Sequence, residues 1–219
     1  MDDPSIRIRP IQPQDAPEAA VLWRRGLDQT VDAAPTEKRK LYREYFDKHA
    51  EEECSEGGAV GINGAGLIDF YSSRTNDACM FVAILVGRAM DDEGTPSAPS
   101  GDTSKVVGMV GVKRGMDSAI FPMDSEEQRE DYNTFSIWKM SVAEESRGRG
   151  VGRKLMAKAE EWARDEESSV LDGVAAKKRM RLYTANPIAA AFYTSALGFV
   201  VEEMTDRYGI YVKALDTST

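Results

Sequence analysis

The amino-acid sequence predicts one α/β domain in which a β-sheet is covered by helices. A chain of 219 residues is long enough to form one such core. Segments with strand-like and helix-like apolar periodicity alternate along it. In addition, the glycine-rich segment 147–152 joins an apolar strand to an amphipathic helix, as is typical of α/β proteins. We therefore expect residues 1–219 to form a single domain.

The N-terminal part is predicted to contain a strand, two helices and a loop. Apolar and polar residues alternate over 5–9, which predicts a strand that Pro10 ends. One helix is expected from about Asp15 to Asp28, and Thr36 is a favoured residue for capping the next. Residues 51–66 begin with acidic side chains and contain five glycines, which predicts a mobile loop.

The middle of the chain is predicted to form three strands, at 80–86, 105–113 and 135–142. Segment 91–104, between the first two strands, is rich in Gly, Pro, Ser and Asp and predicts a flexible insertion. After the glycine-rich loop, apolar residues recur at helical spacing from residue 151 to about residue 166.

The C-terminal part predicts a strand over 180–184, a helix and two final strands. Asn186 and Pro187 favour the start of that helix, and Gly198 favours its end. The two final strands are predicted at 200–203 and 208–213.

The composition indicates an acidic protein whose partners are not nucleic acids. The sequence contains 28 Lys and Arg against 37 Asp and Glu, a formal net charge of −9 that repels nucleic acid and attracts cationic compounds. No apolar run approaches the ~20 residues of a membrane helix, and the first residues do not resemble a signal peptide. We expect a cytoplasmic monomer or homodimer with no membrane partner.

The cysteines and the histidine argue against two classes of site. Cys54 and Cys79 lie far apart and no C-x-x-C is present, so neither a metal site nor a disulfide framework is expected. His49 is the single histidine and no G-x-S-x-G occurs, which argues against a Ser-His-Asp arrangement.

The glycine-rich loop at 147–152 has the properties of an anion-binding site. The first turn of a helix leaves backbone N–H groups without intrahelical partners, and the helix dipole favours negative charge there. Glycines let a phosphate approach those N–H groups, and the guanidinium groups of Arg147 and Arg149 add charge and paired donors.

Two common phosphate-binding motifs do not fit this loop. A P-loop requires Lys and then Ser or Thr after its last glycine, whereas Arg153 and Lys154 follow Gly152. A dinucleotide-binding fingerprint requires an acidic residue at the end of a strand about 20 positions further on. Asp172 has that spacing, but it lies in a polar segment.

Two motifs resemble those of the GCN5-related N-acetyltransferase (GNAT) superfamily. Met140-Ser141-Val142 followed by Arg147-x-x-Gly150-x-Gly152 is similar to the acetyl-coenzyme A motif of that family. The second motif consists of Asn186, Pro187, Ala190, Phe192, Tyr193, Gly198 and Phe199. The resemblance covers about 80–213 well and extends to the first strand and helix at 5–30, whereas 31–79 matches loosely.

The resemblance implies a GNAT-like mixed, largely antiparallel sheet, flanked by helices and splayed in its centre around coenzyme A. It implies acetyl-CoA as cosubstrate and no metal. The main chain of Met140 and Val142 would pair with the pantetheine arm like an added strand, and amides of 147–152 would hold the pyrophosphate. The residues expected at the coenzyme are Met140, Ser141, Val142, Arg147, Gly148, Arg149, Gly150, Val151, Gly152, Arg153, Asn186 and Tyr193.

The activity that the resemblance implies is transfer of an acetyl group to a primary amine of a small molecule or peptide. A neutral amine attacks the thioester directly in a ternary complex, so no protein nucleophile is needed. The leaving thiolate needs a proton or a hydrogen bond. In the family, the tyrosine that matches Tyr193 supplies that donor, which makes Tyr193 the expected catalytic residue.

The general base is not identified by the sequence. Many relatives carry a glutamate at the position of Ser136 in this chain. Nearby or poorly matched candidates are Glu130, Asp131, Tyr132, Asp69 and Tyr71. We expect the amine to lose its proton through water or backbone carbonyls.

The sequence leaves two alternative functions open. The chain could be an acetyl-CoA-binding regulatory or degenerate module without turnover. It could also acetylate a protein N-terminus or a lysine, which depends on the loosely matched region 31–79.

Overall fold

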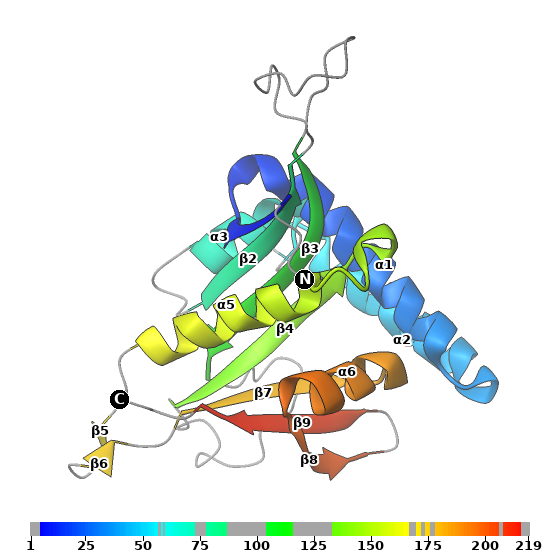
Figure 1. The fold of residues 1–219 in the computed structure, drawn as a ribbon. Helices are drawn as coiled ribbons and strands as arrows, with labels where there is room; N and C mark the ends of the chain where they lie inside the picture. The colour runs from blue at the N-terminus through cyan, green and yellow to red at the C-terminus, as the bar shows by residue number, and fades with distance from the viewer. Residues whose placement is uncertain are drawn as a thin grey trace.

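The fold is built on a seven-stranded sheet with the strand order β1-β2-β3-β4-β7-β9-β8 (Figure 1). The computed structural model describes residues 5–56, 58, 60–72, 78–86, 104–115, 133–166, 170–171, 174–175, 178–205 and 208–215. The strands are β1 Ile6–Pro10, β2 Ala78–Leu85, β3 Lys105–Arg114, β4 Thr134–Val142, β7 Arg179–Thr184, β8 Val200–Met204 and β9 Gly209–Ala214. Short strands β5 (Val170–Leu171) and β6 (Val174–Ala175) form a separate pair.

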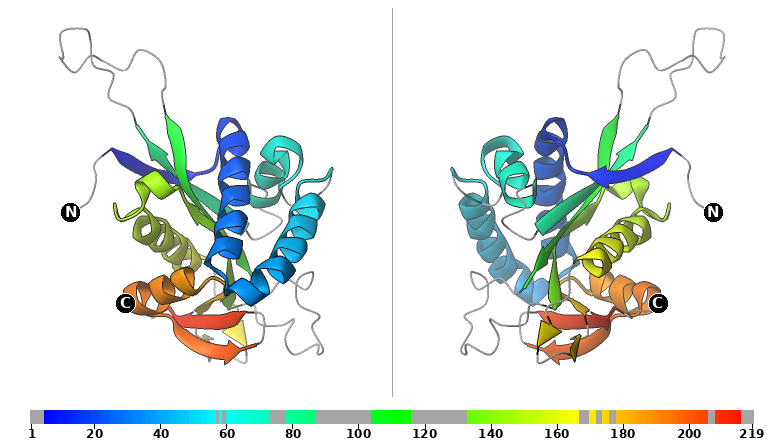
Figure 2. Two further views of the ribbon diagram at one scale, coloured as in Figure 1. Left: turned by 90° about the vertical axis from the view of Figure 1, so that its right-hand side faces the viewer. Right: turned by 90° about the vertical axis from the view of Figure 1, so that its left-hand side faces the viewer.

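The helices lie on both faces of the sheet (Figure 2). They are α1 Ala16–Ala33, α2 Thr36–Glu53, α3 Ala65–Ser72, α5 Val151–Asp165 and α6 Pro187–Leu197. α5 and α6 cover one face, whereas α1, α2 and α3 lie on the other, with α2 packed on the outside of α1. The mixed, largely antiparallel sheet flanked by helices is therefore confirmed.

The apolar pattern of the sequence explains this layering. β2 and β3 are almost continuously apolar, and both are buried along most of their length because helices cover each side. α5 buries one apolar stripe against the sheet and exposes its charged face. Residues that belong to this stripe are Val151, Leu155, Met156, Ala159 and Ala163.

The sheet opens in its centre because β4 and β7 pair over only part of their length. Every other neighbouring pair of strands is antiparallel, but β4 and β7 are parallel. Their three paired positions are Thr134 with Arg179, Phe135 with Met180, and Ser136 with Arg181. Beyond Ser136 the two strands diverge, as the expected splay requires.

The region 31–79 contains more regular structure than the sequence predicts. α1 continues to Ala33, and α2 begins with Thr36 as its first helical residue, after Pro35 at the N-cap position. The predicted loop at 51–66 is partly wrong, because α2 extends to Glu53 and α3 starts at Ala65.

Glycines make this compact connection between α2 and α3 possible. Gly61 and Gly64 have φ of 66° and 83°, which other residues adopt with strain. A Cβ on Gly66 would lie 2.3 Å from the carbonyl oxygen of Gly58, so the backbone segments touch directly. Here glycine permits a tight turn into a helix.

The expected insertion at 91–104 lies outside the described residues except for Ser104.

Candidate active site

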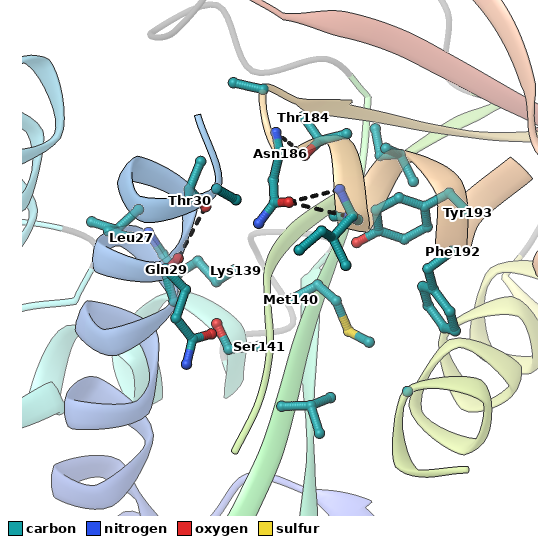
Figure 3. Close-up of a pocket in the computed structure, with 18 of the residues that line it drawn as sticks. Leu27, Gln29, Thr30, Lys139, Met140, Ser141, Thr184, Asn186, Phe192 and Tyr193 are labelled. Carbon is teal, nitrogen blue, oxygen red and sulfur yellow. Dashed lines mark hydrogen bonds between the residues drawn. The ribbon is translucent and has the colours of Figure 1, made fainter. Parts of the chain in front are cut away.

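A cavity of about 1710 Å³ occupies the gap between β4 and β7. Its walls come from α1, α2, β4, the loop after β4, the first turn of α5, the end of β7 and the start of α6. Figure 3 shows α1 on one side of this space and α6 on the other, with β4 between them. All the residues that the sequence places at the coenzyme line this cavity, so the fold brings both motifs together.

The loop before α5 presents backbone N–H groups to the cavity. Gly148 and Gly150 have φ of 74° and 77°, a left-handed conformation that favours glycine. Gly150 is the N-cap residue of α5, and no side chain caps this helix end. Its first-turn amides are therefore available to an anion.

Gly152 lies in close contact with two neighbouring side chains. A Cβ on Gly152 would lie 3.0 Å from Cζ of Phe192 and 3.3 Å from Cε of Met140. The first turn of α5 thus lies directly against β4 and α6, which narrows the cavity at this point. A Cβ at this position would require the side chains of Phe192 or Met140 to move by a few tenths of an ångström.

Polar side chains surround the same loop. A guanidinium N–H of Arg147 donates a hydrogen bond to Oε1 of Gln29 on α1. Arg149 donates to Oγ of Ser5 over 3.4 Å. Ser146 is fully buried at the cavity wall, and its Oγ has no hydrogen-bond partner. An anion at the loop would therefore meet two guanidinium groups on side chains that the N-terminal elements position.

β4 carries an irregularity where it borders the cavity. Its pairing with β3 shifts register between Met109 and Gly111, and Lys139 has a φ of 50°. The side chain of Lys139 is only 5% exposed although the residue as a whole is half-buried. The exposed surface of Lys139 therefore belongs mainly to its main chain, and the residue lines the cavity.

The next residues of β4 face opposite walls. Met140 lies toward α5 and α6, as its closeness to Gly152 shows. Ser141 lies toward α1, where a Cβ on Gly26 would be 2.4 Å from the Ser141 Oγ (Figure 3). The β4 edge is thus enclosed from both sides while it stays unpaired with β7.

Asn186 holds the start of α6 at the cavity wall. Its side-chain oxygen accepts hydrogen bonds from the backbone N–H groups of Ile188, over 2.9 Å, and Ala189, over 3.3 Å. Gly198 ends the helix with a φ of 74°. Both predicted helix ends are confirmed.

Tyr193 places its hydroxyl at the cavity (Figure 3). Its ring is fixed between Phe192 and Phe199, with centroids 5.6 and 5.7 Å away, and the residue is 5% exposed. The hydroxyl has no hydrogen-bond partner among the described residues. Burial raises the pKa of Tyr193 far above its usual value, so the phenol stays protonated and can act only as a neutral donor or acceptor.

The structure reveals a polar contact that the sequence reasoning missed. The ammonium of Lys139 forms an ion pair with Glu53 at the end of α2, and lies 4.6 Å from the centroid of the Trp23 ring on α1. His49 packs edge-on against the same Trp23 ring, at 6.0 Å between centroids. A lysine inside an apolar strand was a signal for such a pair, since a buried ammonium needs a partner.

Those candidates for a general base that the structure describes do not line this cavity. Ser136 is buried, and its Oγ donates a hydrogen bond to the carbonyl oxygen of Gly115 over 2.8 Å. Asp69 and Tyr71 belong to α3 and do not line the cavity. Residues Glu130, Asp131 and Tyr132 lie outside the described part of the chain.

Two features are absent from the part of the chain that the structure describes. It contains no cluster of three or more His, Cys, Asp or Glu side chains arranged to hold a metal ion. None of its helices combines the length and the apolar character needed to cross a membrane.

Comparison with known proteins identifies relatives of this fold. The family model described as "Acetyltransferase (GNAT) family" matches residues 69–199. A GNAT-family acetyltransferase from Staphylococcus aureus Mu50 is 14% identical, with a TM-score of 0.53 over 96% of this chain and 99% of its own. No curated protein matches the chain.

Two further solved structures have the same fold. The PaiA N-acetyltransferase of Thermoplasma acidophilum, solved in complex with coenzyme A, is 16% identical; its TM-score is 0.54, with 96% of this chain and 99% of that chain covered. The GNAT domain of S. lividans PAT is 13% identical. Its TM-score is 0.51, with 96% of this chain and 90% of that chain covered. At these identities the likeness concerns the fold alone.

Proposed function

Because the chain belongs to the GNAT acetyltransferase family, we propose that it transfers the acetyl group of acetyl-CoA to a primary amine of a small molecule or peptide. One observation carries the proposal: a single cavity joins an uncapped helix N-terminus, an unpaired strand edge and a buried tyrosine hydroxyl. An acyl-coenzyme A has a matching group for each of them, namely a pyrophosphate, an amide-containing arm and a thioester.

The first turn of α5 is the proposed site of the pyrophosphate. The left-handed Gly148 and Gly150 expose amides that can each donate to a phosphate oxygen. Arg149 and Arg153 add positive charge at the cavity wall. This cation-rich loop stands out in a chain whose net charge is −9, so a local anion site explains it better than general surface charge.

The edge of β4 is the proposed site of the pantetheine arm. Main-chain groups from Lys139 to Val142 border the cavity on the side where β7 has diverged. The two amide groups of pantetheine could pair with this edge as an added strand does. Asn186 and Ala189 of α6 border the same channel from the other side.

The chemical step follows from the position of Tyr193. A neutral amine nitrogen forms a bond to the thioester carbonyl carbon, and the C–S bond then breaks. The Tyr193 hydroxyl donates a hydrogen bond to the departing sulfur, because its raised pKa keeps the phenol protonated, and water then protonates the thiolate. The ammonium proton leaves through water, because Ser136, at the position where many relatives carry a glutamate, does not line the cavity.

Turnover of acetyl-CoA tests this function directly. The purified protein is mixed with acetyl-CoA and a panel of primary amines, and release of free coenzyme A thiol is followed together with the mass of the acetylated amine. Calorimetry with coenzyme A runs in parallel. Binding together with acetylated product supports the proposal, whereas tight binding without product from any amine, peptide or protein acceptor would support a regulatory module.

A further inference from the structure

The cavity continues through the sheet to the face opposite the α5 loop. The glycine-rich loop lies with α5 on one face, whereas α1 and α2 lie on the other (Figure 2). Both helices contribute to the same cavity wall. If the coenzyme enters from the α5 side, the part lined by α1 and α2 is left for the acceptor. We call this part the acceptor chamber; the inference below rests on the proposed function.

Aromatic side chains line the acceptor chamber. Those on α1 and α2 are Trp23, Tyr42, Tyr45, Phe46 and His49, and those from the other side are Tyr183 at the end of β7 and Tyr208 just before β9. The rings form two groups. His49 stacks on Tyr45 with an interplanar angle of 16°, and Tyr183 meets Tyr208 edge-on at 5.8 Å between centroids.

Part of this apolar surface is exposed. Tyr45 and Leu41, one turn apart on α2, are 52% and 55% exposed, and both line the chamber. α2 packs on α1 rather than on the sheet, so the fold itself does not require large apolar side chains here. Clustered exposed apolar groups in a cavity are typical of a surface that a ligand covers.

The chamber wall carries little charge. The Lys139 ammonium is neutralised by Glu53. Burial, assisted by the charge of Lys139, lowers the pKa of His49 below its usual 6.5, although Glu53 and Glu52 oppose this shift. The imidazole is therefore neutral at pH 7.

The described carboxylates that border the cavity are exposed to solvent. Among the described residues that line the whole cavity, the carboxylates are Asp32 and Glu144. Asp32 has a side chain 76% exposed and lies 3.7 Å from Arg43, and Glu144 belongs to the turn that precedes the glycine-rich loop. Because solvent screens exposed carboxylates, they attract a second ammonium group of an acceptor only weakly.

From these observations we propose that the acceptor is a primary amine carried on an uncharged aromatic ring. The ring lies among the aromatic side chains of α1, α2 and β7, where offset and edge-on contacts are available. The amine extends past Lys139 toward the β4 edge and the hydroxyl of Tyr193. Polyamines and other acceptors with a second positive charge are disfavoured, because the described carboxylates at the cavity are exposed and not buried beside the rings.

A matched series of amines tests this substrate class. The probes are 2-phenylethylamine, 2-cyclohexylethylamine and spermidine; the first two share charge and chain length and differ in aromaticity. We expect kcat/KM for 2-phenylethylamine to exceed the other two values by about tenfold or more. Equal or higher kcat/KM for spermidine would overturn the inference while leaving acetyl transfer intact. Coenzyme A binding with no turnover of any amine would instead reject the proposed function, and the inference with it.

Two substitutions of Tyr45 separate stacking from a structural effect. Tyr45→Leu removes the ring, whereas Tyr45→Phe removes only the hydroxyl. We expect Tyr45→Leu to raise KM for 2-phenylethylamine about tenfold and to leave KM for acetyl-CoA and the thermal midpoint unchanged. Tyr45→Phe should keep the wild-type KM. Similar KM values in both variants, or a parallel change in KM for acetyl-CoA, would overturn the inference.

Discussion

The ammonium of Lys139 in β4 is paired with the carboxylate of Glu53 at the last turn of α2, 86 positions earlier in the chain. The side chains are 5% and 18% exposed, and the same ammonium lies over the ring of Trp23 in α1. One buried cation thereby connects α1, α2 and β4 at the residue where β4 adopts a φ of 50°. The pair holds the wall of the acceptor chamber against the strand edge proposed to bind the coenzyme.

Removal of one charge from this pair is expected to destabilise the fold. Glu53→Gln leaves the Lys139 ammonium buried without its counter-ion, and we expect a loss of about 2 kcal/mol in the free energy of unfolding. This is below the ~3–5 kcal/mol of fully buried pairs, because Glu53 keeps some solvent contact. Glu52→Gln, which affects an exposed pair with Lys48 at 3.8 Å, is the matched control and should cost less than ~1 kcal/mol. Urea unfolding measures both, and equal losses would contradict a special role for Glu53.

Alanine at Gly150 should weaken coenzyme A binding. The side chain would stand at a φ of 77° in the turn that presents the α5 amides. Gly198→Ala places the same change at a φ of 74°, at the far end of α6. Both variants should lose a similar ~1–2 kcal/mol of stability, but only Gly150→Ala should lower coenzyme A affinity, by tenfold or more. Calorimetric titration decides; unchanged affinity in folded Gly150→Ala would refute the phosphate site.

Phenylalanine at Tyr193 should slow the chemical step and preserve the fold. The ring contacts with Phe192 and Phe199 remain, so coenzyme affinity and stability should change little. Loss of the donor should lower kcat by about 10²-fold. Tyr211→Phe is the control, since Tyr211 is also 5% exposed but does not line the cavity. Full turnover by Tyr193→Phe, under conditions where chemistry limits the rate, would assign the tyrosine to packing alone.

Acid should destabilise the protein partly through His49. Its pKa in the folded state is lowered, mainly by burial, so the unfolded chain binds the proton first as pH falls. Neutral His49 therefore contributes its full stabilisation above the unfolded-state pKa of about 6.5. That stabilisation is lost progressively as pH falls toward the lower pKa of the folded state. We expect His49→Gln to lose less stability than the wild type between pH 7.5 and 5. Parallel pH profiles of unfolding free energy in the two proteins would show that His49 does not contribute.

The two cysteines should be unreactive in the folded protein. Burial, with a smaller effect of Glu166, raises the pKa of Cys79 to about 11, and burial also raises the pKa of Cys54. At pH 8 a shift of two pH units from 9.0 reduces the Cys79 thiolate by about 100-fold. Native protein should therefore react with a disulfide reagent far more slowly than urea-unfolded protein. Rapid labelling of both thiols in the native state would contradict this.

Local patterns in the sequence were sufficient for much of the fold. The strands of the seven-stranded sheet and α5 follow from apolar periodicity, and the ends of α6 follow from Asn186 and Gly198, because these signals act over a few residues. The glycine-rich loop at 147–152 was recognisable for the same reason. α3 was not predicted because a glycine-rich sequence occurs in mobile loops as well as in tight turns, and the local pattern does not distinguish the two.

Only the tertiary structure determined how the candidate site is assembled. The divergence of β4 from β7 depends on which strands become neighbours, and the chamber depends on α2 reaching the same cavity as β7. The Lys139–Glu53 pair and the neutral environment of His49 arise from burial of residues that are distant in sequence. Short-range periodicity therefore determined the elements and the coenzyme motifs, whereas long-range packing and desolvation decided which side chains face the acceptor.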